Sequence, residues 1–347
     1  MIKNIQRFIS LVLLLLACVT MTYSQTVSDL SISDKLESYR DSLKRTPYEW
    51  HLPIMGKKIR EMGFDIPYPN GVSFTYAHSK QDLLLSDAFV GFDPDELIPI
   101  DGFARFRSIS SVVNAYTVRY DFWLLPFMNF YGIGGSVDAI TNIQLGLPFE
   151  AEFDTKRKTG LAYGWGTVLG GAIGPMIIST DFAMMWTKMA DLDQPNKSIL
   201  FGARTGYLMK FRNPERNLAF LVGAQYIGIN KAGSGKLELI SASDKEKALG
   251  DLNGWYDNLT DREQEVLEPL YSGLANWLDS SESTNLYYKF NKRFISPWSM
   301  NVGLNFQYNK RYTLTGIYSF GSRSQLVVGL GYRFGIKGKN LLSGLQL

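Results

Sequence analysis

Few side chains in this sequence have the types and spacing that catalysis or metal binding requires. The chain contains 2 histidines, and its single cysteine leaves no Cys/His spacing of a metal site. The stretch from Lys231 to Lys236 is not a phosphate-binding loop, because its first glycine is missing and Leu237 stands where Ser or Thr is needed. A tight glycine turn explains it better, and we expect no cofactor and no metal site.

His78 is the one side chain that suggests nucleophilic or acid–base chemistry. It continues the apolar face formed by Val72, Phe74 and Tyr76, so we predict that it lies on the outer surface beside them. Catalysis by His78 would need a nucleophile next to it in space, and the sequence assigns it no serine partner. A histidine at the edge of an apolar surface is the simpler interpretation, so we expect no catalytic residue.

Charged side chains recur on one side of alternating stretches. Residues 115–137 (AYTVRYDFWLLPFMNFYGIGGSV) place Val118 and Tyr120 on an apolar face and Arg119 and Asp121 on the opposite face. A repeat of two is the pattern of a β-strand with one apolar and one polar face. A proline separates the two halves of the stretch, which we therefore predict to be a hairpin.

The same alternation continues from residue 70 to residue 336. In a soluble β-sandwich the apolar face would point into a core, whereas in a membrane barrel it would meet lipid and the polar face would line the interior. We expect Arg119 and Asp121 to pair with each other or with a neighbouring strand, for instance at Glu150 or Glu152. The charges predicted to line a barrel interior are Arg119, Asp121, Glu150, Glu152, Asp181, Arg204, Lys210 and Arg333.

Three features favour the membrane barrel. The polar faces combine glycine with charges that a lumen can hold, Tyr and Trp lie near predicted strand ends, and closure would remove the edges of many amphipathic strands. We predict an all-β fold, an antiparallel transmembrane β-barrel over residues 70–336. It should contain about 12 strands, within a range of roughly 10 to 14.

The first 24 residues have the pattern of a secretory signal peptide, with Lys3 and Arg7 before an apolar run and cleavage after Ser24. A lipoprotein signal modified at Cys18 is the alternative, and both imply export. The apolar run is shorter than the ~20 residues that a membrane helix needs. Without the signal the net charge falls from +3 to about +1, with no basic run, so nucleic acid is not an expected partner.

Two segments have helical rather than alternating spacing. Residues 25–69 are predicted to form a helical N-terminal periplasmic arm, with a plug-like segment in the lumen as the alternative. Residues 243–281 are predicted to form an inserted helical pair, with a capping box at Ser243 and Thr260 or Asp261 as the N-cap of its second helix. Counting four strands back from the C-terminus places this insertion on the side of the membrane where the last strand ends.

The sequence resembles uncharacterised bacterial outer-membrane β-barrel proteins. The stretch YTVRYDFWLLPFMNFYG (116–132) and the closing strand GLGYRFGI (329–336) carry the resemblance, which covers residues 70–336. These motifs imply a fold and a location in the outer membrane, and they specify no activity. Many such barrels end on an aromatic residue that is read during assembly. Here a tail, residues 337–347, follows, so Phe334 is expected to serve as that signal internally.

We expect a porin-like, non-enzymatic channel or transporter for small solutes in the outer membrane of a Gram-negative cell. The alternative from another class is a lipid-acting outer-membrane enzyme that uses His78, because some outer-membrane lipid hydrolases carry a His and a Ser on the outer wall. A structural or assembly role is the third hypothesis. The expected partners are membrane lipids, the outer-membrane assembly machinery and a solute that the sequence does not identify.

Overall fold

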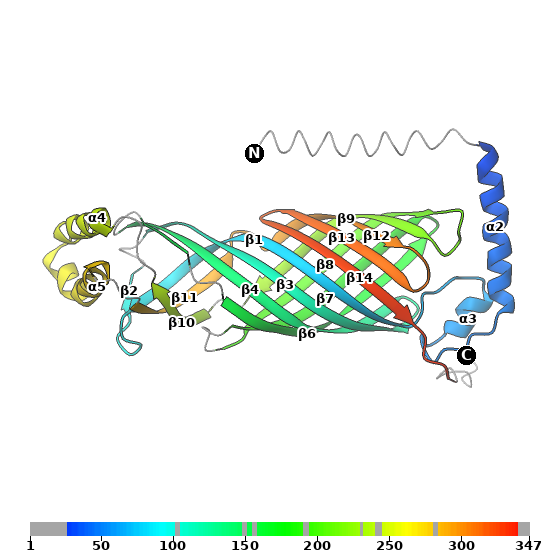
Figure 1. Cartoon of the computed structure of the whole chain (residues 1–347), viewed down its shortest axis with the longest axis horizontal. Helices are drawn as coiled ribbons and strands as arrows, with labels where there is room; N and C mark the ends of the chain where they lie inside the picture. The colour runs from blue at the N-terminus through cyan, green and yellow to red at the C-terminus, as the bar shows by residue number, and fades with distance from the viewer. Residues whose placement is uncertain are drawn as a thin grey trace.

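The strands form a long antiparallel barrel with helices beyond both of its ends (Figure 1). The computed structural model describes residues 26–100, 105–147, 151–154, 158–189, 194–229, 232–239, 245–279 and 284–338. The predicted signal peptide lies outside them. Ten strands close the wall, since β1 pairs with β14 on one side and with β3 on the other. In pairing order they are β1 (Asn70–Gly91), β14 (Arg323–Phe334), β13 (Tyr312–Gly321), β12 (Trp298–Gln307), β9 (Asn217–Ile229), β8 (Asn196–Lys210), β7 (Met176–Met189), β6 (Lys158–Ile173), β4 (Met128–Leu147) and β3 (Arg105–Leu125).

The two ends of the barrel differ in the length of their connections. At the end where β14 finishes, on the right of Figure 1, residues 126–127 join β3 to β4 and residues 174–175 join β6 to β7. At the opposite end, residues 92–104 separate β1 from β3, and residues 148–157 separate β4 from β6. Outer-membrane barrels have short periplasmic turns and longer outer loops. We therefore assign the end with the short connections, where β14 finishes, as the periplasmic end, and the opposite end as the outer end.

The closed ring holds fewer strands than the prediction of about 12, which is not confirmed. Four strands lie outside the ring: β2 (Ile98–Pro99), β5 (Ala151–Asp154), β10 (Ala232–Leu239) and β11 (Thr284–Phe294). β11 pairs with β1 from Leu83 to Gly91, whereas β14 pairs with β1 only as far as Gln81. β11 thus takes the place of β14 beyond the ring and extends the wall at the outer end.

The expected side of the helical insertion was wrong. Its helices, α4 (Lys245–Asp257) and α5 (Asp261–Asp279), lie at the outer end, opposite the end where β14 finishes (Figure 1). β11 and β12 run in the same direction, because both are parallel to β14 through strands that pair antiparallel with it. They are successive parts of one crossing. The prediction counted them as two separate passes of the chain through the membrane, and this error placed the insertion at the wrong end of the barrel.

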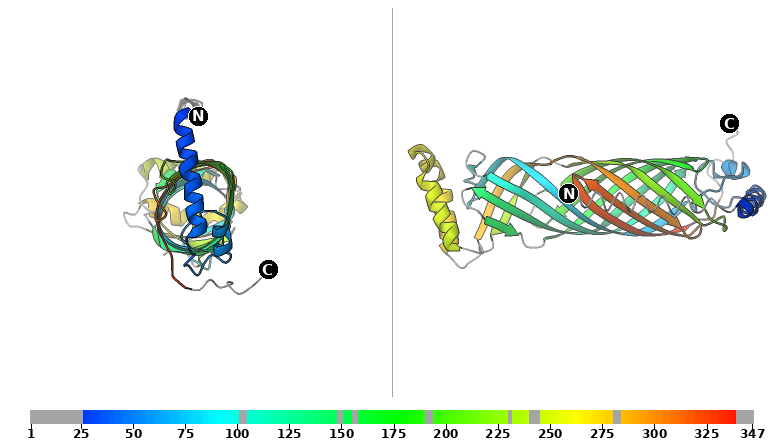
Figure 2. Two further views of the ribbon diagram at one scale, coloured as in Figure 1. Left: turned by 90° about the vertical axis from the view of Figure 1, so that its right-hand side faces the viewer. Right: turned by 90° about the horizontal axis from the view of Figure 1, so that it is seen from above.

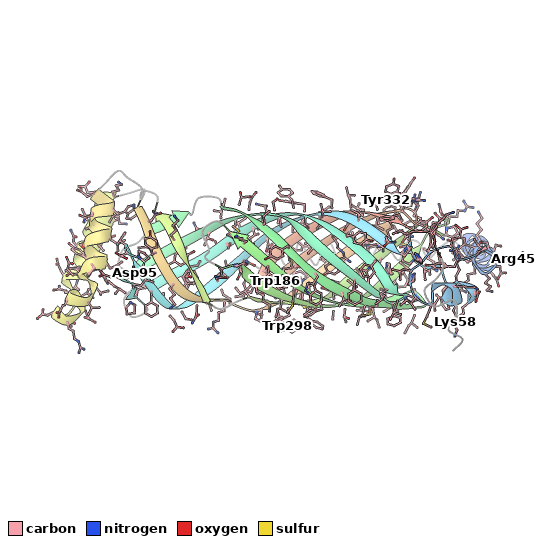
Figure 3. All side chains as sticks on the ribbon, turned by 90° about the horizontal axis from the view of Figure 1, so that it is seen from below. Arg45, Lys58, Asp95, Trp186, Trp298 and Tyr332 are labelled. Carbon is pink, nitrogen blue, oxygen red and sulfur yellow. The ribbon has the colours of Figure 1, made fainter. Side chains whose placement is uncertain are left out.

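Side chains alternate between the two faces of the wall. On β3, Val118 and Tyr120 are 53% and 44% exposed, whereas Thr117 and Asp121 are only 6% and 5% exposed. Figure 3 shows side chains projecting outward around the ribbon, with the labelled Tyr332 among them. The apolar face therefore points outward and the polar face points into the barrel.

The N-terminal arm lies under the barrel, against its periplasmic rim. Figure 2 shows α2 (Thr26–Arg45) and α3 (Gly56–Glu61) beyond the strand ends rather than between the strands. Ile54 N donates to Leu124 O at 2.8 Å at the end of β3. Asp65 accepts hydrogen bonds from Tyr39 of α2 at 2.8 Å and from Lys310 at 3.0 Å, which ties α2 to the β12–β13 turn. Burial, with the Asp65 carboxylate beside it, raises the pKa of Tyr39.

The helical pair has its own core and packs on the extended part of β1. Thr260, one of the two residues predicted for this role, is the N-cap of α5, since its N–H and hydroxyl donate to Glu263 at 2.9 and 2.6 Å. These hydrogen bonds hold the pKa of Glu263 below its usual range. The predicted capping box at Ser243 lies outside the described residues. α5 buries Leu267 in a cluster that contains Ala88 of β1. None of the described helices is long and apolar enough to cross a membrane.

Replacing Leu267 with alanine should loosen the helical pair, because the side chain is 0% exposed and its loss leaves a cavity that costs about 2–5 kcal/mol. We expect faster protease cleavage within residues 245–279. The barrel itself should stay folded, so that its band on a gel should still change position only after the sample is heated. Val266→Ala is the matched control, since Val266 is 48% exposed. Equal cleavage rates in the two variants would contradict the packing of α5 on β1.

Candidate functional site

Four inner-wall side chains form a hydrogen-bonded group near the periplasmic end, which we call the periplasmic cluster: Arg119, Asp121, Asn129 and Arg333. Asp121 accepts hydrogen bonds from Asn129 Nδ2 at 2.7 Å and from Arg333 Nη2 at 2.9 Å. Arg119 Nη2 donates to Asn129 Oδ1 at 2.9 Å, and Arg119 Nε lies 4.0 Å from Asp121 Oδ1. The Arg119 guanidinium also lies 3.8 Å from the centre of the Tyr131 ring. One carboxylate thus serves two arginines, and the cluster has an excess of positive charge.

A second group, the Arg204 cluster, consists of Asp181, Arg204 and Asn301. Arg204 Nη1 donates to Asp181 Oδ1, and Arg204 Nε donates to Asn301 Oδ1 at 3.1 Å. The Arg204 and Asp181 side chains are 13% and 15% exposed, and Asn301 is 0% exposed. The charges of this cluster balance each other in a place where water screens them poorly.

In each cluster, glycine on an intervening strand lets one contact reach across to the next strand but one. Gly71 of β1 lies opposite Asp121 of β3 on one side and opposite Arg333 of β14 on the other. A Cβ atom at Gly71 would lie 2.7 Å from Asp121 Oδ1, which is closer than a carbon atom can approach. Gly223 of β9 lies between the strands of Arg204 and Asn301 in the same way. The absence of a side chain at these positions creates the space in which the hydrogen bonds form.

Most of the predicted lumen charges belong to these two clusters, namely Arg119, Asp121, Asp181, Arg204 and Arg333. Lys210 is different, because it is the exposed last residue of β8 at the periplasmic rim. Glu150 lies outside the described residues.

Of the partners expected for Arg119 and Asp121, the structure shows the pairing with each other and not the one at Glu152. Asp121 lies opposite Tyr131 of β4, whereas Glu152 of β5 lies opposite Gln144, much further along β4 towards the outer end. Arg333 from the last strand takes the carboxylate instead.

Several polar residues of the inner wall were not among the predicted lumen residues, although the alternation of residues 300–307 puts Asn301 on the polar face. Asn129 and Asn301 supply amides to the two clusters, and Arg323 is 5% exposed at the start of β14. In the alternation of residues 325–334, Gln325 shares the polar face with Arg333, and Arg323 stands two residues before Gln325. Extending the same count by one step would have placed Arg323 inside.

His78 is exposed on the outer wall, where the alternation predicts it. His78 Nδ1 lies 2.8 Å from Asn114 Oδ1 on the neighbouring strand β3. Because that oxygen can only accept, Nδ1 carries the proton and Nε2 is the basic nitrogen. Ser324 of β14 is on the same outer face, opposite Lys80, and its Oγ lies 3.2 Å from Tyr318 Oη. No group of three or more His, Cys, Asp or Glu side chains among the described residues could hold a metal ion.

The wall, its surface and its interior together define a bacterial outer-membrane β-barrel protein. A closed ring satisfies the backbone hydrogen bonds that lipid cannot supply, and the outer face of the ring is apolar. Aromatic pairs occur towards each end, Tyr312 with Tyr332 and Tyr226 with Trp298, each with ring centres 5.4 Å apart. Such rings are typical of the two membrane–water interfaces.

Comparison with known proteins finds similar solved structures at low sequence identity. Neither a protein-family profile nor a curated protein sequence matches the chain significantly. The outer membrane protein OprG from Pseudomonas aeruginosa is similar in structure, with a TM-score of 0.37 and 9% identity over 78% of this chain and 100% of that one. The transport unit of the autotransporter AIDA-I from Escherichia coli has a TM-score of 0.33 and 10% identity over 77% and 90%. The toluene transporter TbuX from Ralstonia pickettii has a TM-score of 0.26 and 9% identity over 77% and 90%.

Gly71→Ala should destabilise the barrel, because the added methyl group must displace the Asp121 carboxylate from Arg333. Overpacking of this kind costs about 1–3 kcal/mol. The measurement is the temperature at which the folded band converts to the unfolded band on a gel. Gly132→Ala is the control, since a Cβ there meets nothing within 4 Å. Equal conversion temperatures for the two variants would show that Asp121 does not need the space above Gly71.

Proposed function

We propose that the protein is a non-enzymatic channel or transporter that carries small solutes across the outer membrane through the barrel interior. The observation that carries this proposal is that, in the part of the chain that the structure describes, the ion pairs formed between strand residues of the closed ring lie on its inner wall. Inside a closed barrel, charged side chains can meet water or solute, whereas on the lipid face each would cost roughly 2–4 kcal/mol near the midplane.

The direction of the ion pairs supports a path along the axis. Asp181 and Arg204 lie on the adjacent strands β7 and β8, and Asp121 and Arg333 lie on β3 and β14, the two neighbours of β1. Among the described residues, the ion pairs inside the barrel thus join residues of one strand, of neighbouring strands or of strands two apart, rather than opposite walls. They follow the circumference of the wall and do not bridge the middle of the lumen.

The first test is conduction by the purified protein in a planar bilayer. With a cysteine at Thr75, a partly buried inner-wall residue, a membrane-impermeant thiol reagent should reduce the current, because the attached group narrows the path. Phe74→Cys is the control, since Phe74 is 51% exposed on the outer face. Absence of any conductance in the wild type, or an equal loss of current with both cysteines, would contradict the proposal.

A lipid-acting enzyme is the second candidate, and the His78–Asn114 hydrogen bond favours it. An asparagine that fixes the tautomer of a histidine leaves Nε2 ready to act as a general base. By register, Ser324 of β14 lies on the same outer face as a diagonal neighbour of His78 across the strand pair. In this candidate the substrate would be an ester of a membrane lipid, since the three side chains face outward.

A phospholipid-hydrolysis assay on the purified protein separates the two candidates. The channel proposal expects no hydrolysis above background in the wild type and none in His78→Ala or Ser324→Ala. Hydrolysis by the wild type that falls at least about a hundredfold in both variants would overturn it, since that is the typical effect of losing a general base. Lys80→Gln, a change on the same outer face, is the control. If the protein shows neither conductance in the bilayer nor hydrolysis in the lipid assay, a structural or assembly role is favoured.

A further inference from the structure

Arg323 is a buried cation at the outer end of the closed barrel. It is the first residue of β14, lies opposite Gln81 of β1 and is 5% exposed. Gln81 is the last residue of β1 that pairs with β14. Arg323 therefore lies at the level where the closed ring gives way to the extension, far from the periplasmic cluster at the other end of β14.

The hydrogen-bonding capacity of Arg323 is only partly used. Its Nη2 donates to Ser299 Oγ at 2.8 Å. Its Nε is buried and has no hydrogen-bond partner among the residues that the structure describes. Ser79 Oγ and Asn301 Nδ2 are also buried there without a partner. Ser79 of β1 lies opposite Gln325 of β14. On the other side of β14, Asn301 lies two strands away, opposite Ser319 of β13 and two residues from Ser299.

The surroundings of Arg323 on the inner wall are uncharged. By register the positions next to it are Ser79, Gln81, Ser299, Ser319 and Gln325. Within the described part of the chain, no carboxylate forms an ion pair with Arg323, whereas Arg333 and Arg204 each meet an aspartate. The sequence thus places a lone guanidinium among hydroxyl and amide groups.

Two properties of this arrangement indicate a ligand of negative charge. A buried guanidinium without a counter-charge is costly to remove from water, so a bound anion would relieve that cost. The planar N–H groups of arginine match the spacing of two oxygen atoms on a phosphate, sulfate or carboxylate. Chloride would satisfy the charge but could not use that geometry.

We propose that Arg323 binds a small oxyanion inside the barrel at its outer end. The inference rests on the proposed function and deepens it, because it names anionic solutes, with a phosphate, sulfate or carboxylate group, as the class that enters the lumen. Ser299 holds Nη2 in position, and the Ser79 hydroxyl and the Asn301 amide provide further hydrogen bonds. The buried position inside the ring excludes the headgroups of the surrounding lipids.

The test measures the binding of inorganic phosphate to the purified full-length barrel by calorimetry, at an ionic strength kept constant with chloride. The wild type should bind phosphate saturably, and Arg323→Gln should bind it at least about tenfold more weakly, because a charge-assisted pair of hydrogen bonds is lost. Arg323→Lys should be intermediate, since it keeps the charge and loses the planar donors. Lys188→Gln removes the same charge from an exposed position and should bind like the wild type.

The heat-dependent gel shift establishes that each variant is folded, and Arg323→Lys serves if Arg323→Gln is not. The proposal is overturned if phosphate has no effect beyond that of chloride, or if Lys188→Gln loses as much affinity as Arg323→Gln. The bilayer experiment is independent of this result. Conductance without phosphate binding would overturn the oxyanion site and leave the channel, whereas phosphate binding without conductance would overturn the channel and leave the binding site.

Discussion

The pairing of β1 with both β14 and β3 is the interaction on which the rest of the structure depends. β1 pairs from Asn70 to Gln81 with β14 and from Asn70 to Leu83 with β3, so the first and last strands of the ring share a continuous hydrogen-bonded ladder. In lipid an unpaired strand edge costs several kcal/mol for each backbone group, since no water replaces the lost hydrogen bond. Closure at β1 therefore fixes the number of strands, and with it which inner side chains face each other. The ion pair between Asp121 and Arg333 spans this same seam.

The interior depends on small residues as much as on charged ones. A ring of ten strands has a narrow interior, and side chains fill much of it. An arginine can reach a partner two strands away only where the strand between them has no side chain, as at Gly71 and Gly223. The glycines and the charged residues of the inner faces therefore act together. The glycine provides the space, and side chains on the neighbouring strands form the hydrogen bonds.

The sequence predicted the faces of the strands and failed on their pairing, for a physical reason. Lipid outside and polar groups inside impose a repeat of two on every strand, so the opposite directions of Val118 and Asp121 follow from local sequence. β11 and β12 show the same repeat, although together they make one crossing, because alternation does not reveal which strands are neighbours. The partner of Asp121 lies 212 residues away in sequence. That contact depends on the register in which β1 pairs with β14 and β3 to close the barrel, and no short stretch of sequence specifies that register.

The charges inside the barrel are distributed unequally along its axis. At the periplasmic end Asp121 is shared by two arginines, the Arg204 cluster is balanced, and Arg323 at the outer end has no acid partner among the described residues. Each aspartate of these clusters is already bound to an arginine, so a cation entering the lumen would find no free carboxylate there. An anion that entered from the outer end would first meet the guanidinium of Arg323, which has no acid partner among the described residues. It would then meet the excess of N–H donors in the periplasmic cluster. Low-dielectric walls strengthen such fields. In the proposed channel, these N–H donors would favour anions over cations, independently of the width of the path.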